Sequence, residues 1–200
     1  MKKFELTSEF VTFLGKKLFR IKALVAFGDV KEGELGGFVE KEENLDQSGD
    51  AWVSGNAWVS GNARVSGNAQ VSGDAQVFGD ARVFGNAQVF GNARVSGDAQ
   101  VSGDARVFGD AWVSGDAWVF GDAHIQCRRD CSAASCFGSE NRTTTFFREK
   151  DGGIGVRCGC FYGTMSEFRE KVKERHGDSR LAKEYLMLAD LMEFRLSKDE

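Results

Sequence analysis

The fold is decided by residues 51–122, which read AWVSGN AWVSGN ARVSGN AQVSGD AQVFGD ARVFGN AQVFGN ARVSGD AQVSGD ARVFGD AWVSGD AWVFGD. These twelve hexads share the form Ala-x-Val-y-Gly-(Asn or Asp), in which x is Trp, Arg or Gln and y is Ser or Phe. Alternate residues of a strand point to opposite faces, so the Ala and Val columns share one face. Gly followed by Asn or Asp tolerates the backbone conformations of a corner. The sequence therefore predicts a coil of short strands that stacks Ala and Val inside.

The hexads resemble the hexapeptide repeat of bacterial transferases. In that repeat an aliphatic residue is followed four positions later by a small one, as Val53 is followed by Ala57 here. Proteins of that family wind three hexads into one triangular, left-handed turn of eighteen residues, so the resemblance implies four turns for the twelve hexads. We therefore expect an all-β solenoid core of the left-handed parallel β-helix type.

The repeat register extends more weakly beyond the hexads. Gly33, Val39 and Leu45 are expected in the column of Ala residues, and Ala123-His124-Ile125 continues the pattern at the other end. With eighteen residues per turn, side chains of the x column stack on three faces. The faces carry Trp52, Gln70, Gln88, Arg106 and His124; Trp58, Gln76, Arg94 and Trp112; and Arg64, Arg82, Gln100 and Trp118.

The segments beside the coil are expected to cap its two open ends. Alternating apolar residues predict an N-terminal β-hairpin cap over residues 1–32. The β-helix is expected to occupy residues 33–126. Residues 127–200 are expected to form a small α+β domain that caps the coil and mediates oligomerisation.

Within the C-terminal domain, two strands are expected at residues 143–147 and 154–162. A capping box that begins at Thr164 opens a helix ending at Gly177, and Asp178 is expected to cap a second helix. The second helix is apolar on more than one side, which is typical of a helix buried on two sides. We expect it to pack on the first helix and on another subunit.

The outward x and y columns hold four Trp and five Phe. So many outward aromatic side chains exceed what a monomer exposes, and aromatic residues with Arg are favoured at interfaces. We therefore expect a homo-oligomer, with a trimer favoured. The residues expected in its interfaces are Trp52, Trp58, Phe90, Phe108, Trp112, Leu188, Leu191 and Met192.

Arg64 and Arg82 fall on adjacent rungs of one face. Two guanidinium groups so placed repel each other unless an anion lies between them. Phe84 and Trp118 belong to the same face, and an aromatic ring can stack on a base. The combination suits a nucleotide held by these four residues at a subunit interface. Pairing of the arginines with Asp80 or Asp98 is the interpretation that the pattern favours, because exposed ion pairs of this kind are common.

A catalytic histidine is the second candidate feature. The resemblance implies an acyltransferase in which a histidine at a subunit interface takes a proton from the acceptor. The twelve hexads contain no histidine, and His124 lies just beyond them in an outward position. This departure from the family pattern argues against the family's activity. An acyltransferase that uses a thioester donor and His124 as its base therefore stays the alternative hypothesis.

A zinc site is the third candidate feature. The five cysteines are Cys127, Cys131, Cys136, Cys158 and Cys160. Their spacings differ from the paired C-x2-C of common structural zinc sites. Cys158 and Cys160 are expected to be small residues on a buried strand face. The sequence therefore predicts no metal site, and it predicts no cofactor.

Composition limits the compartment and the partners. The chain has no apolar run of about 18 residues, the length that a membrane helix needs. The first seven residues do not form a signal peptide, and an odd number of cysteines fits a reducing cytosol. The hexads contain seven Asp and four Arg, and this excess of negative charge is too small to indicate a mimic of the DNA phosphate backbone. We expect a cytoplasmic protein with no membrane partner and no direct DNA binding.

A second resemblance covers nearly the whole chain. The run LGGFVEKEENL at residues 35–45 resembles uncharacterised proteins of phage and prophage genomes. So does the tail from TTTFF at residues 143–147 through CGCF to HGD at residues 176–178. The resemblance implies a phage context but no reaction. We expect a non-enzymatic protein that binds a host defence protein or sequesters a nucleotide immune signal in the bacterial cytoplasm. A self-assembling scaffold is a further alternative.

Overall fold

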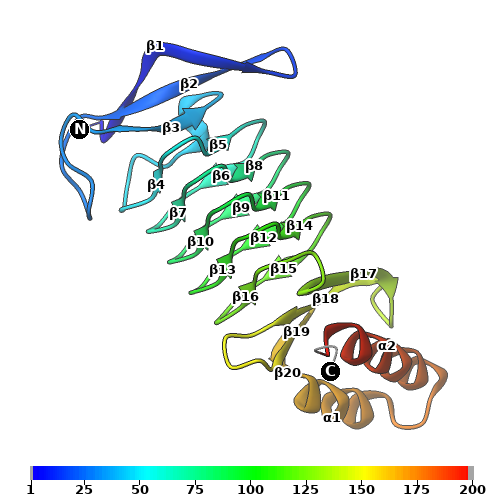
Figure 1. The fold of residues 1–200 in the computed structure, drawn as a ribbon. Coiled ribbons are helices and arrows are strands. Elements are labelled where there is room, and N and C mark those ends of the chain that lie inside the picture. Colours follow the sequence, from blue (N-terminus) through cyan, green and yellow to red (C-terminus); the bar gives the residue numbers. More distant parts are fainter. Residues whose placement is uncertain (1, 198–200) are drawn as a thin grey trace.

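Residues 2–197 are described by a computed structural model. The molecule is elongated, with a β-hairpin at one end, a β-solenoid in the middle and an α+β unit at the other end (Figure 1). This arrangement confirms the predicted fold class. None of the helices within the described residues is long and apolar enough to cross a membrane.

Each hexad contributes one two-residue strand, formed by its x residue and its Val. These strands are β4 (Trp52–Val53), β5 (Trp58–Val59), β6 (Arg64–Val65), β7 (Gln70–Val71), β8 (Gln76–Val77), β9 (Arg82–Val83), β10 (Gln88–Val89), β11 (Arg94–Val95), β12 (Gln100–Val101), β13 (Arg106–Val107), β14 (Trp112–Val113) and β15 (Trp118–Val119). The next strand, β16 (His124–Ile125), continues the coil beyond the hexads. Parallel pairs join residues eighteen positions apart, such as Gln70 with Gln88. The predicted stacking of the three faces is therefore confirmed.

The inward columns form the core of the solenoid. Every Ala and Val of the hexads has an exposed fraction of 2% or less. The corner glycines have φ between 61° and 77°, a region that other residues rarely adopt. A Cβ atom at Gly73 would also lie 3.0 Å from the backbone nitrogen of Gly91, because successive corners stack closely. The positive φ favours glycine at every corner, and the close stacking of the corners adds a second reason at most of them.

The register at the N-terminal end differs from the prediction. Val39 pairs with Val59 and Leu45 bridges to Val65, so both lie in the Val column and not in the Ala column. Gly33 lies in an exposed turn outside the coil. The cause is a longer corner: eight positions separate Leu45 from Val53, against six between successive Val residues of the hexads. A fixed period of eighteen therefore fails at this end.

The N-terminal cap is the predicted hairpin. Strand β1 (Phe4–Phe13) pairs antiparallel with β2 (Lys16–Ala23), which pairs with β3 (Leu35–Val39). Because β3 pairs with β5, the hairpin extends one sheet of the solenoid. A short 3-10 helix, η1 (Glu42–Asn44), follows β3.

The C-terminal unit contains a four-stranded antiparallel sheet. Its strands are β17 (Cys131–Phe137), β18 (Arg142–Arg148), β19 (Ile154–Cys158) and β20 (Phe161–Thr164). The prediction of two strands was wrong in two respects. The segment 154–162 is divided by a turn at Gly159, whose φ is 57°. Strand β17 was missed because its sequence, CSAASCF, has no clear alternation of apolar and polar residues.

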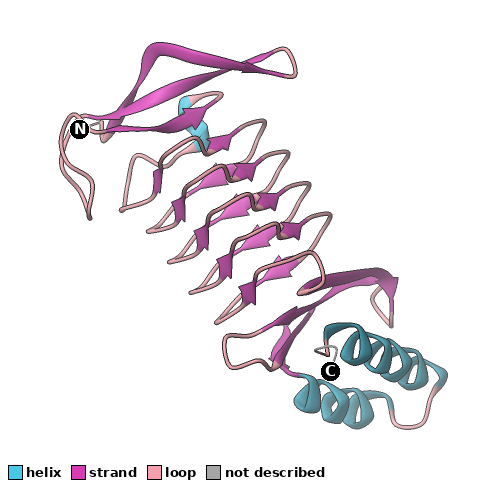
Figure 2. Cartoon of the chain, in the orientation of Figure 1, coloured by secondary structure: helices cyan, strands magenta, loops and turns pink. Residues whose placement is uncertain are grey.

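Two helices complete this unit, α1 (Met165–His176) and α2 (Arg180–Leu196). Figure 2 shows both at the C-terminal end of the solenoid. The predicted capping box is confirmed, because Thr164 Oγ1 accepts from the Glu167 backbone nitrogen and Glu167 Oε2 accepts from that of Thr164. The predicted cap of the second helix was wrong. Ser179, not Asp178, caps α2, and its Oγ accepts from the Ala182 nitrogen at 3.2 Å.

The sheet of the C-terminal unit separates two hydrophobic cores. Phe147 and Cys131 join the core of the solenoid. Phe146, the neighbour of Phe147 on β18, belongs to a second core beneath α1 and α2. The backbone nitrogen of Trp118 also donates to Thr145 Oγ1 at 3.0 Å. One face of the sheet therefore closes the solenoid and the other supports the helices.

Candidate functional site

The arginine pair lies on an outward face near the N-terminal end of the coil. Arg64 on β6 and Arg82 on β9 are direct partners in the parallel ladder, as predicted, and both side chains are exposed. They line a cavity of about 310 Å³ together with Lys41, Glu43, Asn62, Ala63 and Asp80. We call this cavity the arginine cleft.

The interpretation that the sequence favoured for the arginines was an ion pair with Asp80 or Asp98. Among residues 2–197, neither Arg64 nor Arg82 makes a side-chain hydrogen bond or an ion pair. Asp80 accepts instead from the amide of Asn62, with Nδ2 and Oδ1 3.0 Å apart. The two guanidinium groups therefore remain available to a ligand.

Lys41 is a member of the arginine cleft that sequence reasoning missed. It follows β3, and its Nζ donates to Asn62 Oδ1 at 3.2 Å. Its place depends on the longer corner before Val53, so counting in periods of eighteen does not reveal it. The cleft thus combines three cationic side chains with two carboxylates, those of Glu43 and Asp80.

The aromatic residues predicted for the same site are only partly brought together. Phe84 follows Arg82 by two positions and is half-buried. Trp118 lies two rungs from Arg82, because Gln100 pairs with both. The guanidinium of Arg157 covers the Trp118 ring, with its carbon 4.1 Å from the ring centroid. Trp118 therefore does not belong to the arginine cleft.

Two of the tryptophans predicted for a subunit interface lie beneath the N-terminal cap. Trp52 is 2% exposed, with the rings of Phe4 and Phe27 centred 6.5 and 5.4 Å away. Trp58 is 9% exposed, and the Phe13 ring lies 4.6 Å from it. The prediction was wrong for both residues, because the same chain already covers them.

The remaining interface residues fall into two groups. Leu188 and Met192 are buried in the second core of the same chain, so the prediction was wrong for them too. On α2, Leu191 is 58% exposed and shares its face with Met187 and Phe194, which are still more exposed. Residues on the solenoid that stay at least partly exposed are Phe90, Phe108 and Trp112.

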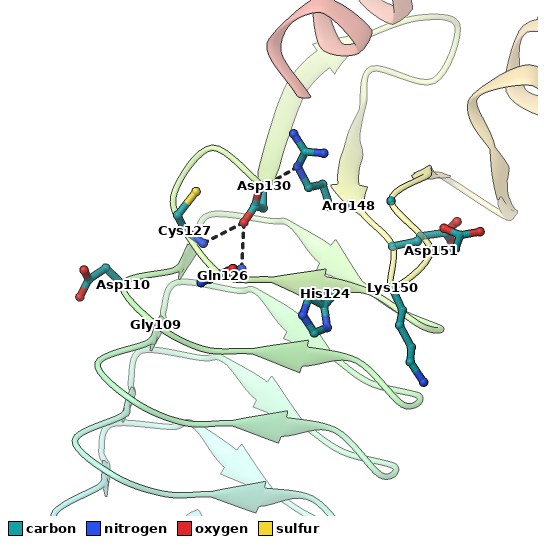
Figure 3. A pocket seen from close by; sticks show the side chains of 11 residues that line it. Gly109, Asp110, His124, Gln126, Cys127, Asp130, Arg148, Lys150 and Asp151 are labelled. Atoms are coloured by element: carbon teal, nitrogen blue, oxygen red, sulfur yellow. Dashed lines mark hydrogen bonds and ion pairs between the residues drawn. The ribbon is translucent and has the colours of Figure 1, made fainter. Parts of the chain in front are cut away.

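A cavity of about 590 Å³ lies where the solenoid meets the C-terminal sheet (Figure 3). Asp130, which lines this cavity, holds three neighbouring groups through its carboxylate. One carboxylate oxygen accepts from the backbone nitrogens of Gln126 and Cys127, both at 2.9 Å, and the other pairs with Arg148 at 2.9 Å. Burial raises the pKa of Glu149, which accepts from the Tyr162 hydroxyl at 3.0 Å. The bond from the Gln126 nitrogen to Asp130 links the end of the solenoid to the C-terminal unit.

His124, the base of the alternative hypothesis, lines this junction cavity. Its ring packs edge-on against Phe108, with 4.7 Å between centroids. Its Nδ1 is buried and has no hydrogen-bond partner among the described residues. A catalytic histidine is usually held by a hydrogen bond on the nitrogen opposite the reacting one. The contact with Phe108 therefore suits a packed side chain better than an oriented base.

The five cysteines differ in exposure: Cys131 is buried, Cys158 is half-buried and the other three are exposed. Burial raises the pKa of Cys131 to about 12, so its thiol stays protonated. Thr144 Oγ1 donates to Cys158 Sγ at 3.2 Å. Cys160 lies exposed in the turn between β19 and β20, so the expected burial was wrong for it. In the part of the chain that the structure describes, no three His, Cys, Asp or Glu residues are grouped to hold a metal ion.

Comparison with known proteins supports the repeat architecture. The family model described as YdcK Beta solenoid repeat matches residues 57–73, 75–89, 87–101 and 99–115. The middle of this chain is a β-solenoid repeat. The matched segments lie within the hexads, and no curated protein matches the chain. The transferase type and the phage context stay predictions.

Proposed function

We propose that the protein is a non-enzymatic binding protein and that its arginine cleft holds a phosphate group of a nucleotide. The observation that carries the proposal is the pair Arg64 and Arg82, stacked in register without a partner in residues 2–197. Neighbouring strands lie about 4.8 Å apart, a spacing that lets one phosphate contact both side chains. Charge-assisted hydrogen bonds from two guanidinium groups to one anion are strong and directional.

The surroundings of the arginines support a small anionic ligand. Lys41 adds a third cation, and Phe84 supplies a half-buried ring beside Arg82. Glu43 and Asp80 also line the cleft and would repel an anion that approached them. In the phage context that the resemblance implies, the ligand would be a nucleotide signal of the host.

We predict that Arg64→Ala and Arg82→Ala each weaken nucleotide binding about tenfold or more. A hydrogen bond to a charged group contributes about 1.5–3 kcal/mol, and about 1.4 kcal/mol corresponds to tenfold. Higher salt should weaken binding too, because exposed charges are screened. Calorimetric titration with a panel of cyclic and linear nucleotides measures both effects. Arg94→Ala is the matched control, since Arg94 lies on another sheet between Gln76 and Trp112.

Two results would contradict this proposal. One is the absence of heat with every nucleotide in the panel. The other is unchanged affinity in the double variant of Arg64 and Arg82, with its thermal unfolding also unchanged. A host protein would then be the favoured partner of the solenoid surface.

We also propose that the chain forms a homo-oligomer, a trimer being favoured, through the apolar face of α2. Met187, Leu191 and Phe194 are 71%, 58% and 81% exposed and recur at helical spacing on one face. Light scattering at micromolar concentration should give a multiple of the 21.9 kDa chain mass. Phe194→Glu should lower that mass because it places a charge in the contact, whereas Lys173→Glu, at an exposed position on α1, should not. A monomeric mass for the unaltered chain would contradict the proposal.

A further inference from the structure

We propose that the C-terminal unit carries a second ligand site, one that takes a small organic anion bearing a flat aromatic ring. The site is a cavity of about 560 Å³, which we call the aromatic pocket. It lies where the β17–β18 hairpin and the β19–β20 turn meet α1 and α2, the end of the chain opposite the N-terminal cap (Figure 1). Cavities of this size hold ligands as large as a nucleotide or a cofactor.

The inner wall of the aromatic pocket is a chain of rings. The centroids of Phe161 and Phe168 are 5.7 Å apart, and those of Phe168 and Tyr185 are 6.0 Å apart. Phe168 and Tyr185 are buried, while Phe161 is half-buried. Because aromatic rings prefer tilted or offset contacts with one another, this wall suits a flat apolar group.

Tyr185 is held in place by its neighbours. The ring of His176 stacks on it, with centroids 5.6 Å apart and an angle of 23° between the planes. Gly138 lies against its hydroxyl, and a Cβ atom at that glycine would overlap the hydroxyl oxygen. The wall is therefore fixed from both sides by the packing of the chain itself.

The rim of the aromatic pocket is cationic. Arg142 comes from β18, and Lys171 and Arg175 lie one turn apart on α1. Glu140 is the one carboxylate among the described lining residues, and it lies 3.8 Å from Arg142 with both side chains well exposed. Such exposed pairs contribute little, so Arg142 stays available to a ligand. Arg175 has no ion pair or hydrogen bond among the described residues.

Basic residues at the end of a helix also have a purely structural explanation. They stabilise the negative end of the helix dipole, which accounts for Arg175 and His176 in the last turn of α1. That explanation does not cover Arg142, which lies on a strand. Lys171, one turn earlier, forms an exposed ion pair with Glu174 at 2.7 Å, so it is the least available of the three cations. Cations from separate elements around an aromatic wall match a ring that carries a phosphate or carboxylate group.

The test is calorimetric titration of the full chain with naphthyl phosphate and naphthylacetate, which attach a phosphate or a carboxylate to one flat ring. We expect at least one of them to bind. Inorganic phosphate and naphthol, which carry only one of the two features, should bind at least about tenfold more weakly. The preferred anion then identifies the acidic group of the natural ligand.

Arg142→Ala and Arg175→Ala should each weaken binding of the preferred probe about tenfold, the effect of losing one hydrogen bond to a charged group. Lys173→Ala is the matched control, because it removes an exposed cation from α1 that does not line the pocket. The double variant of Arg64 and Arg82 should retain full affinity for the probe. This control shows whether a negative result counts against the proposed aromatic pocket or against the proposed arginine cleft.

Circular dichroism of each variant checks that the fold is retained, which we expect because both arginine side chains are exposed. The inference is overturned if neither aromatic anion binds, or if naphthol binds as tightly as they do. Full affinity in the double variant of Arg142 and Arg175 would overturn it as well. So would an equal loss in Lys173→Ala, since charge alone would then explain the binding.

Discussion

Val89→Asp is expected to abolish folding of the solenoid. Val89 lies on β10 in the middle of the coil, is 0% exposed and is flanked in its column by Val71 and Val107. A carboxylate there meets only Ala and Val side chains and finds no hydrogen-bond partner. Burying such a group costs several kcal/mol, a large part of the ~5–15 kcal/mol that stabilises a typical domain. Soluble yield, circular dichroism and urea unfolding measure the effect.

Gln88→Asp is the matched control, since it places the same carboxylate one residue away on the outward side of β10. Gln88 is exposed, so the charge stays in water and the free energy of unfolding should change by less than about 0.5 kcal/mol. The two variants therefore report on the assignment of faces. Similar behaviour of both would contradict the inward place of the Val column.

The solenoid could be predicted because every hexad repeats the same pattern of inward Ala and Val followed by a corner Gly. The period of six and the corner glycine were enough to predict the strands, the faces and the pairing of Arg64 with Arg82 on adjacent strands. The prediction failed where the period failed, at Val39, since two additional residues before Val53 shift the register. No pattern within the hexads indicates that the N-terminal hairpin covers Trp52.

The candidate sites likewise could be predicted only where their residues belong to the repeat. The arginine pair follows from the repeat, whereas Lys41 enters the arginine cleft from a segment outside it. The aromatic pocket was not predicted, because it joins residues such as Arg142 and Tyr185 that are far apart in the sequence. Only the packing of two hairpin turns against two helices brings them together.

Leu188→Asp is expected to unfold the two helices while the solenoid stays folded. Leu188 is 5% exposed and belongs to the core beneath α1 and α2, which is separate from the core of the coil. Losing a buried leucine costs about 2–5 kcal/mol, and an unpaired buried carboxylate adds to that cost. The helical circular dichroism signal should disappear. Limited proteolysis should cut the C-terminal unit and leave the hexads intact, because the stacked Ala and Val columns do not depend on Leu188.

Leu191→Asp separates this packing role from oligomerisation. Leu191 lies on the same helix but is 58% exposed, so its replacement should leave the helical signal and the unfolding midpoint nearly unchanged. It should still lower the mass seen by light scattering if the apolar face of α2 joins subunits. Loss of the helices in both variants would show that α2 is buried on two sides in the assembled state, as its sequence pattern first indicated. Loss in neither would contradict the inward orientation of Leu188, and with it the division of the chain into two cores.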